Sequence, residues 1–377
     1  MGPSGLPPAA DRIDVCRLDG QTLPGVVMIA RSVIGRLVFA LGVFSPAALV
    51  MAQDVAADGE TPWFSQAVDT EKFAVIITGA AATPESREQF RSWTADLYQS
   101  LRDDYGYPDS HTTLLMDDGN NVGELAPMVD GSSELEDIRS ALDQLSQQMA
   151  QGDQLTLFLI GHGSSRFGEA KFNNVGPDMT GSDLAQMLEA FDGQDIVVVN
   201  TTSASFEFSR ELAANGRVIV SATRSAAERY DPVFGGFFIE AMQGRQADLD
   251  RNGRLSILEA FNFASSQTAE WYSEQGRLPT ENAVLDDTGD GLFSREPGRN
   301  ESDGLLAEIA YVDIVRPDEA KTSPGAREIL ADIQRLEREI FILRNQKSNY
   351  LEEDYWSRLE ALLIDLALQT RDYNALP

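Results

Sequence analysis

The chain has 377 residues, 42% hydrophobic and 24% charged, so it is long enough to bury a large core and to hold a main domain with an appendage. Its formal net charge of −30 argues against nucleic acid as a partner, because an acidic surface repels phosphate, and it favours a protein that tolerates divalent cations.

Residues 1–52 are predicted to be a leader that is removed from the mature protein. Two arginines precede the apolar run 37–44, and small residues at 50–52 form a cleavage site, which together indicate a signal peptide over 28–52. The apolar run is too short to span a bilayer, so we expect no stable membrane span after cleavage. Residues 1–27 are either part of this leader or lie upstream of a true start at Met28. The mature protein is therefore expected to be periplasmic or secreted.

The only cysteine of the chain, Cys16, falls inside this predicted leader. The mature protein would then contain no cysteine, although export usually favours disulfide bonds. This distribution excludes both a disulfide framework and a cysteine nucleophile in the mature chain.

After a flexible polar lead-in at 53–70, apolar strand-like runs alternate with amphipathic helical segments. The predicted strands are 73–77, 112–116, 155–160, 196–199 and 217–224, and the predicted helices are 85–105, 133–149, 182–191 and 207–214. This alternation predicts an α/β domain over residues 71–314, with a mainly parallel sheet sandwiched by helices. Two further helices, 234–243 and 256–274, and a late edge strand at 306–314 complete the predicted domain.

The C-terminal part is predicted to be a helical hairpin at 325–373, joined to the domain by a linker at 315–324. Apolar residues recur at 4-3-4-3 spacing, which is typical of a coiled-coil seam. They are Ile329, Ile333, Leu336, Ile340 and Leu343. Asn349 and Glu352 are placed to form a capping box for the second helix. We expect the hairpin to pack on the sheet domain or to form a homo-oligomer, and peptide capture is the alternative.

Residues 248–259 match the EF-hand calcium-loop pattern D-x-[DN]-x-[DN]-G-x5-E at every position. Calcium takes six to eight oxygen ligands, and this spacing supplies them on one turn around the ion. The predicted Ca2+ ligands are Asp248, Asp250, Asn252, the backbone carbonyl of Arg254, Ser256 and Glu259. Helices predicted on both sides fit an EF-hand, and the alternative is an acidic turn that caps the following helix.

A second acidic stretch, 286–291, begins like another calcium loop but has Pro297 where the twelfth ligand would stand. A solvated turn is the favoured interpretation, and a weak cation site or a substrate-side loop is the alternative.

Two polar clusters follow neighbouring predicted strands. The strand at 155–160 ends in Gly161-His162-Gly163, and the strand at 196–199 leads to Ser203. Open parallel sheets carry their chemistry at the carboxyl ends of the strands. We therefore expect His162 and Ser203 to lie side by side at one edge, with His162 either catalytic or a hydrogen-bonded structural residue.

These features resemble the clan CD cysteine peptidases, which include caspases, gingipains and legumain-type peptidases, and they are most similar to bacterial legumain-type, caspase-like proteins. The matching segments are 159–163, 171–173, 177–180, 220–225 and 281–287, together with the calcium loop. The resemblance covers about residues 70–295. It implies a caspase-like fold and a peptidase site.

By this resemblance, His162 matches the catalytic histidine, Gly163 the oxyanion-hole amide and Ser203 the nucleophile. The chain departs from the family here, because the family has a cysteine where Ser203 stands. A serine hydroxyl needs a base that an orienting group holds in the correct tautomer. No acidic residue is clearly placed for this role, and Asp117 and Glu169 are the two suggestions.

Three hypotheses follow. The first is an exported, calcium-binding peptidase homologue that has lost catalysis and binds a peptide or protein ligand. The second is an active hydrolase that uses a Ser203–His162 dyad, or a nucleophile at Ser205 instead. The third is a calcium-binding interaction protein that acts through the hairpin.

Overall fold

A computed structural model describes residues 62–65, 70–120, 122–244, 246–251, 253–298, 303–314 and 324–376. All of them belong to one compact unit, residues 58–377. The predicted leader with its signal peptide lies outside the described residues, as do most of the lead-in and residues 315–323 of the linker. No helix of the described ranges combines the length and the apolar run that crossing a bilayer requires.

The centre of the described unit is a six-stranded sheet with the order β2-β1-β3-β7-β8-β9. Its strands are β1 (Lys72–Thr78), β2 (Thr112–Met116), β3 (Gln154–Ile160), β7 (Asp195–Asn200), β8 (Arg217–Ser221) and β9 (Val284–Asp286). The first five pair in parallel, and β9 adds to β8 in the antiparallel direction. The predicted α/β class with a mainly parallel sheet is confirmed, and it is consistent with the caspase-like fold that the resemblance implies.

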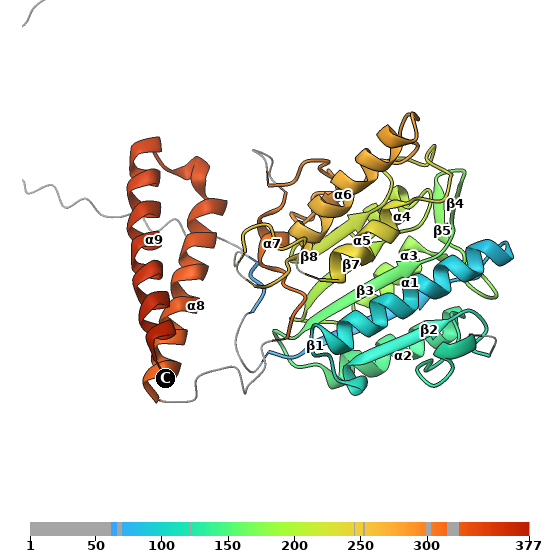
Figure 1. Ribbon diagram of the computed structural model, residues 1–377, viewed down its shortest axis with the longest axis horizontal. Coiled ribbons are helices and arrows are strands. Elements are labelled where there is room, and N and C mark those ends of the chain that lie inside the picture. The colour runs from blue at the N-terminus through green and yellow to red at the C-terminus, as the bar shows by residue number, and fades with distance from the viewer. Residues whose placement is uncertain are drawn as a thin grey trace, which may run out of the picture. The chain divides into compact units, whose positions relative to one another are not determined.

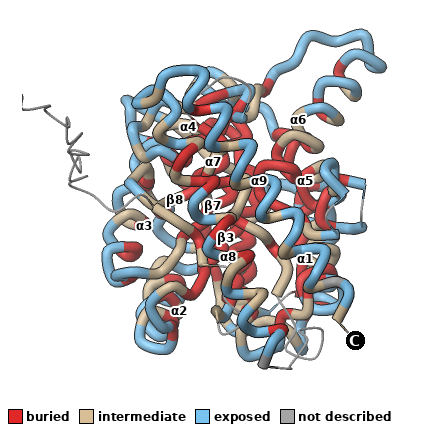
Figure 2. The backbone as a smooth tube through the Cα atoms, turned by 90° about the vertical axis from the view of Figure 1, so that its left-hand side faces the viewer, coloured by how far each residue is buried: buried red, intermediate tan, exposed pale blue. Residues whose placement is uncertain are grey.

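Helices cover both faces of this sheet (Figure 1). One apolar cluster joins Ala74 and Ile76 of β1 to α1 (Pro84–Asp103), α5 (Phe234–Met242) and α6 (Ile257–Glu274). A second cluster joins Val75 and Ile77 of β1 to α2 (Leu135–Gln148), α3 (Gly181–Leu188) and α4 (Phe206–Glu211). Alternate residues of one strand thus face opposite layers. Buried residues gather between the two layers (Figure 2).

A small antiparallel sheet follows directly on β3 and was not predicted from the sequence. It consists of β4 (Gly163–Arg166), β5 (Glu169–Phe172) and β6 (Met179–Thr180), in the order β4-β5-β6. Its strands are only two to four residues long, and alternation is confined to the four residues of β5, so the strand signal is too short to recognise.

The predicted edge strand at 306–314 is wrong. The chain forms a helix there, α7 (Leu305–Ile309), and the edge strand is β9. The carboxylate of Asp287 accepts hydrogen bonds from the backbone N–H groups of Gly304 (2.9 Å) and Ala307 (2.8 Å), which satisfies donors of the first turn of α7. This buried cap comes from a residue that lies far away in the sequence, so the apolar pattern alone did not reveal it.

Two long helices, α8 (Pro324–Asn345) and α9 (Glu352–Ala375), end the described chain. They pack against each other, and the guanidinium of Arg344 donates to both carboxylate oxygens of Glu308 on α7, at 2.8 and 2.7 Å. The predicted capping box is wrong, because α9 begins after Leu351 and no side chain caps it. Three short 3-10 turns, Asp109–His111, Gly123–Leu125 and Lys347–Asn349, complete the elements.

The buried carboxyl of Asp303 should make the protein less stable as the pH rises. Asp303 is 1% exposed, and its burial, with the nearby charges of Asp287 and Asp286, raises its pKa to about 7. In the unfolded chain this carboxyl titrates near its ordinary value of about 3.9. Between these two values the folded protein holds a proton that the unfolded chain has lost. The free energy of unfolding should therefore fall by up to about 4 kcal/mol between pH 4 and pH 7.

An Asp303→Asn variant keeps the group neutral at every pH. We expect its free energy of unfolding, measured by urea titration, to vary less with pH and to exceed that of the wild type at pH 8. The exposed Asp192→Asn is the matched control and should follow the wild-type profile. Equal destabilisation of Asp303→Asn at pH 4 and pH 8 would contradict the prediction.

Candidate functional site

The two polar clusters meet at the carboxyl edge of the sheet. Strands β3 and β7 are direct parallel neighbours, with Leu159 opposite Asn200, so the segments that follow them leave the sheet together. Gly163 and Ser203 are in contact at this edge. His162 stands next to Gly163, so the residues that the resemblance selected occupy one region of the structure.

Ser203 is held by the backbone of Gly163. Its hydroxyl donates to the Gly163 carbonyl oxygen (3.0 Å) and accepts from the Gly163 N–H (3.2 Å). The residue is 2% exposed. A Cβ at position 163 would collide with the Ser203 carbonyl oxygen and with Thr202, so the close approach requires glycine. The N–H that the resemblance assigns to the oxyanion hole therefore binds the hydroxyl of the proposed nucleophile.

His162 is paired with an acidic residue that sequence reasoning missed. Its Nδ1 lies 2.8 Å from Oδ1 of Asp231, which stands in the segment between β8 and α5. The other ring nitrogen, Nε2, is buried and has no hydrogen-bond partner among the described residues, and the ring packs edge-on against Phe90. Within the described chain, no hydrogen bond joins His162 to Ser203. The neutral tautomer with its proton on Nδ1 fits this arrangement, because it leaves no N–H on the buried Nε2.

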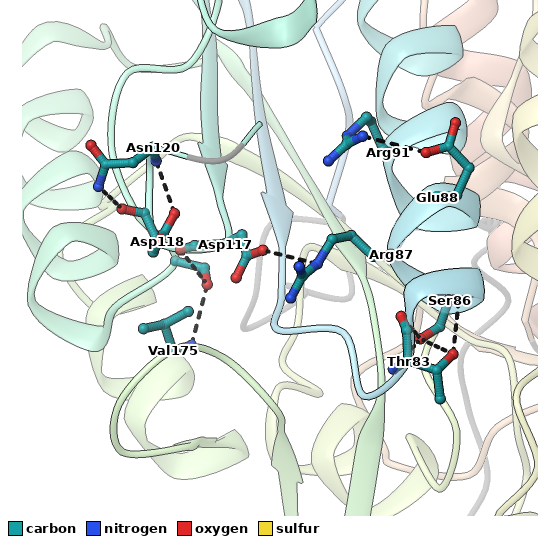
Figure 3. Close-up of polar contacts among 10 residues, drawn as sticks. Thr83, Ser86, Arg87, Glu88, Arg91, Asp117, Asp118, Asn120 and Val175 are labelled. Atoms are coloured by element: carbon teal, nitrogen blue, oxygen red, sulfur yellow. Dashed lines mark hydrogen bonds and ion pairs between the residues drawn. The ribbon is translucent and has the colours of Figure 1, made fainter. Parts of the chain in front are cut away.

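The two acidic residues suggested as orienting groups are engaged elsewhere. Asp117 forms an ion pair with Arg87 on α1 (3.7 Å), as Figure 3 shows. Glu169 pairs with Lys171 on the same strand (2.9 Å). Asp231 lies 69 residues from His162 in the sequence, and no pattern in the sequence connects the two.

Ser205, the alternative nucleophile, belongs to a buried hydroxyl cluster. Its Oγ lies 2.9 Å from the Ser221 hydroxyl and 3.0 Å from the Thr223 hydroxyl. The side chain thus ties the segment after β7 to the end of β8. This geometry gives Ser205 a structural role.

A cavity of about 470 Å³ lies beside Ser203 and His162. It is lined by residues 163–167, Ala204 and Arg229. Glu228, which precedes Arg229, anchors this lining: its carbonyl accepts from the Ala204 N–H (2.8 Å), and its carboxylate accepts from the Asn282 side chain (2.7 Å). A larger cavity of about 520 Å³ lies between α1 and residues 123–128 and includes none of the predicted site residues. The smaller cavity is therefore the one that chemistry or recognition at this edge would use.

The predicted calcium loop brings its acidic side chains together. Carboxylate oxygens of Asp248, Asp250 and Glu259 lie within 4.8 Å of one another, and Oδ1 of Asp248 is buried with no hydrogen-bond partner among the described residues. Three convergent carboxylates with an unsatisfied oxygen fit a hard cation such as Ca2+.

Other features of the loop are less like an EF-hand. Asn252 lies outside the described residues. Ser256 caps α6 in a reciprocal pair with Glu259, so these two predicted ligands also bond to each other. The exit helix α6 adjoins the loop, whereas α5 ends at Met242, several residues before Asp248.

Arg254 connects the loop to the rest of the unit. Its side chain binds Asp313 (2.8 Å) and lies over the Tyr311 ring, and only its backbone carbonyl is a predicted ligand.

No family model matches the chain, and no curated protein matches it. Among the solved structures that match, two illustrate the similarity, both at low identity. A Geobacter sulfurreducens protein is 10% identical with a TM-score of 0.38, and the similarity covers 57% of this chain and 92% of that one. The Drosophila initiator caspase Dronc is 11% identical with a TM-score of 0.36, over 64% of this chain and 89% of Dronc. Both are too distant to assign a site or an activity.

Proposed function

We propose that this chain is a caspase-like, legumain-type peptidase homologue that has lost catalysis and binds peptides or proteins at the carboxyl edge of its sheet. The geometry of Ser203 carries the proposal. A nucleophilic serine must be accessible and must pass its proton to a base. Here the hydroxyl is buried and is bonded to both polar groups of the Gly163 backbone.

The position of His162 supports the same conclusion. A general base needs a ring nitrogen within reach of the proton that it takes. Nε2 is enclosed, and Nδ1 is held by Asp231. A cavity lies beside these residues, and its lining offers hydroxyl, backbone and arginine groups to a ligand. Recognition without turnover is the function that this combination favours.

Calcium binding at residues 248–259 is the second part of the proposal. The three convergent carboxylates support it, and the ion would stabilise the fold. The predicted signal peptide supports a periplasmic or secreted location, where millimolar calcium concentrations suit an extracellular type of site. The C-terminal helices remain a surface for self-association.

An active hydrolase is the second candidate, and the His162–Asp231 pair favours it. A carboxylate on one ring nitrogen of a histidine fixes the tautomer of a catalytic base in serine hydrolases. For this function the Ser203 hydroxyl would have to leave Gly163 and reach the histidine.

A fluorophosphonate probe, which reacts only with activated serines, separates the two functions. We expect the wild-type protein and Ser203→Ala to give the same background labelling by mass spectrometry, with and without calcium. Neither should hydrolyse a mixed panel of fluorogenic peptides and esters. Stoichiometric labelling at Ser203, lost in His162→Ala, would establish the hydrolase instead.

A further inference from the structure

Strand β4 is an open edge beside the cavity. In the small sheet the order β4-β5-β6 leaves one side of β4 without a strand partner. All four residues of β4 line the cavity, together with Phe167, which follows the strand and is fully exposed. An exposed edge strand offers a row of backbone donors and acceptors to an extended chain.

The pairing with β5 determines which backbone groups face this open side. Gly163 stands opposite Phe172, and the Asn173 N–H donates to the His162 carbonyl (3.0 Å). In an antiparallel ladder, hydrogen-bonded pairs alternate with pairs whose backbone groups point away from each other. His162 and Asn173 form a hydrogen-bonded pair, so the next pair, which contains Gly163, is of the second kind. The N–H and C=O of Gly163 therefore point outward, and two residues later those of Ser165 do the same.

The two outward positions differ in what they meet. At Gly163 both groups are taken by the Ser203 hydroxyl, which substitutes for a neighbouring strand. At Ser165 no hydrogen bond from any described residue reaches the backbone, and the residue lines the cavity. The edge of β4 is thus closed at its first outward position and open at its second.

The charge of the cavity lining indicates which kind of peptide would fit. The arginines Arg166 and Arg229 line this cavity, and no acidic residue does. Glu169 stands opposite Arg166 in the ladder, but its carboxylate is paired with Lys171 (2.9 Å). In a protein with a net charge of −30, two arginines in a lining that contains no acidic residue mark a local site for an anion. A carboxylate is bound bidentately by a guanidinium group.

We propose that an extended peptide with an acidic side chain binds as an added antiparallel strand on β4. One peptide residue would exchange two hydrogen bonds with the Ser165 backbone, and the acidic side chain would lie between Arg166 and Arg229. This inference rests on the proposed function and specifies how the ligand binds. Strand addition depends on main-chain hydrogen bonds for affinity and on side-chain contacts for specificity.

The test measures binding of a fluorescein-labelled peptide, acetyl-Thr-Val-Thr-Glu-Thr-Val-Thr-amide, by fluorescence anisotropy. Ser165→Pro removes only the outward N–H, because the β4–β5 ladder does not use it, and proline is tolerated at such edge positions. We expect Ser165→Pro to weaken binding by about five- to tenfold, the value of one hydrogen bond. Ser165→Ala, which keeps the backbone, is the matched control and should bind like the wild type.

Modified peptides supply the second arm. N-methylation at one position of the peptide should weaken binding as Ser165→Pro does, and N-methylation of either adjacent residue should not. Replacing the peptide glutamate by glutamine, or Arg229 by glutamine, should also weaken binding, and the two changes together should cost no more than one alone.

Equal affinity of wild type and Ser165→Pro, or uniform sensitivity to N-methylation, would overturn strand addition even if the protein binds peptides. Absence of binding to wild type at millimolar peptide would overturn it as well. If the proposed function itself were wrong, the result would be different: the fluorophosphonate would label Ser203, or the protein would hydrolyse substrates through Ser203.

Discussion

The Ser203→Cys variant should hydrolyse fluorogenic peptides slowly, and the double variant Ser203→Cys/Asp231→Asn should hydrolyse them at least about tenfold faster. A thiol ionises far more readily than a hydroxyl, and because sulfur is a weak hydrogen-bonding group it leaves the Gly163 backbone more easily than the Ser203 hydroxyl does, so the cysteine can supply the nucleophile that the resemblance implies. The histidine, however, must still exchange protons with the substrate. Its only ring nitrogen that is not enclosed, Nδ1, is held by Asp231.

The second substitution tests whether Asp231 blocks His162 or orients it. Asp231 is about half exposed on its side chain, so asparagine at this position should not disturb the core. The neutral amide binds the ring more weakly than a carboxylate and so releases Nδ1. Asp192→Asn in the Ser203→Cys background controls for the change in net charge, and His162→Ala in the double variant should abolish turnover. Lower activity of the double variant than of Ser203→Cys would mean that Asp231 orients the histidine as a third catalytic group.

The central sheet could be predicted because each strand is a local signal. Runs such as 155–160 and 196–199 are almost continuously apolar, as is typical of strands buried on both faces, and each has a polar turn at its end. The parallel order then places His162 and Ser203 at one edge. The small sheet β4-β5-β6 carries only a weak signal, because alternation is limited to the four residues of β5 and the pairing depends on a turn at residues 167–168.

The details that decide function at the site depend on contacts between distant residues. Asp231 reaches His162 across 69 residues, and the Ser203 hydroxyl bonds to Gly163 across 40. Neither contact follows from residue type or spacing. An exposed aspartate in a turn is common, and a serine after a strand does not by itself indicate a contact or a function. The incorrect strand prediction at 306–314 has the same cause, because Asp287, which lies outside that segment, caps the helix that forms there.

Calcium should raise the midpoint of thermal unfolding of the whole described unit. With a dissociation constant of about 0.1–1 mM, the range of extracellular calcium sites, 5 mM calcium stabilises a protein by about 1–2 kcal/mol, which corresponds to roughly 3–7 °C for a domain of this size. The effect should be global, because the loop is built into the core. Ile257 within the loop and Phe261 just after it are fully buried in the main apolar cluster. The Leu255 carbonyl accepts from the Val312 N–H (2.8 Å).

Tyr311, the residue before Val312, extends this connection to the central sheet. The Tyr311 carbonyl accepts from Nζ of Lys72 (2.6 Å) at the start of β1. Burial, and then the nearby Arg254 charge, lowers the pKa of Lys72 to about 7. A loop that loosens without its ion would therefore disturb both the main apolar cluster and the base of the sheet, and unfolding should remain a single transition.

Glu259→Gln should remove this calcium response and leave the fold in place. The residue is the predicted bidentate ligand, and an amide supplies one neutral oxygen instead of two charged ones. Because that oxygen can still accept from the Ser256 N–H, the helix cap is largely kept, whereas the Leu249 N–H loses its acceptor. We therefore expect the variant in chelator to melt a few degrees below the wild type. Asp290→Asn, in the incomplete acidic loop, is the matched control and should retain the full shift. The measurement is the melting temperature by circular dichroism and by tryptophan fluorescence, each in 5 mM calcium chloride and in chelator. A shift that survives in Glu259→Gln but disappears in Asp290→Asn would move the calcium site to residues 286–291.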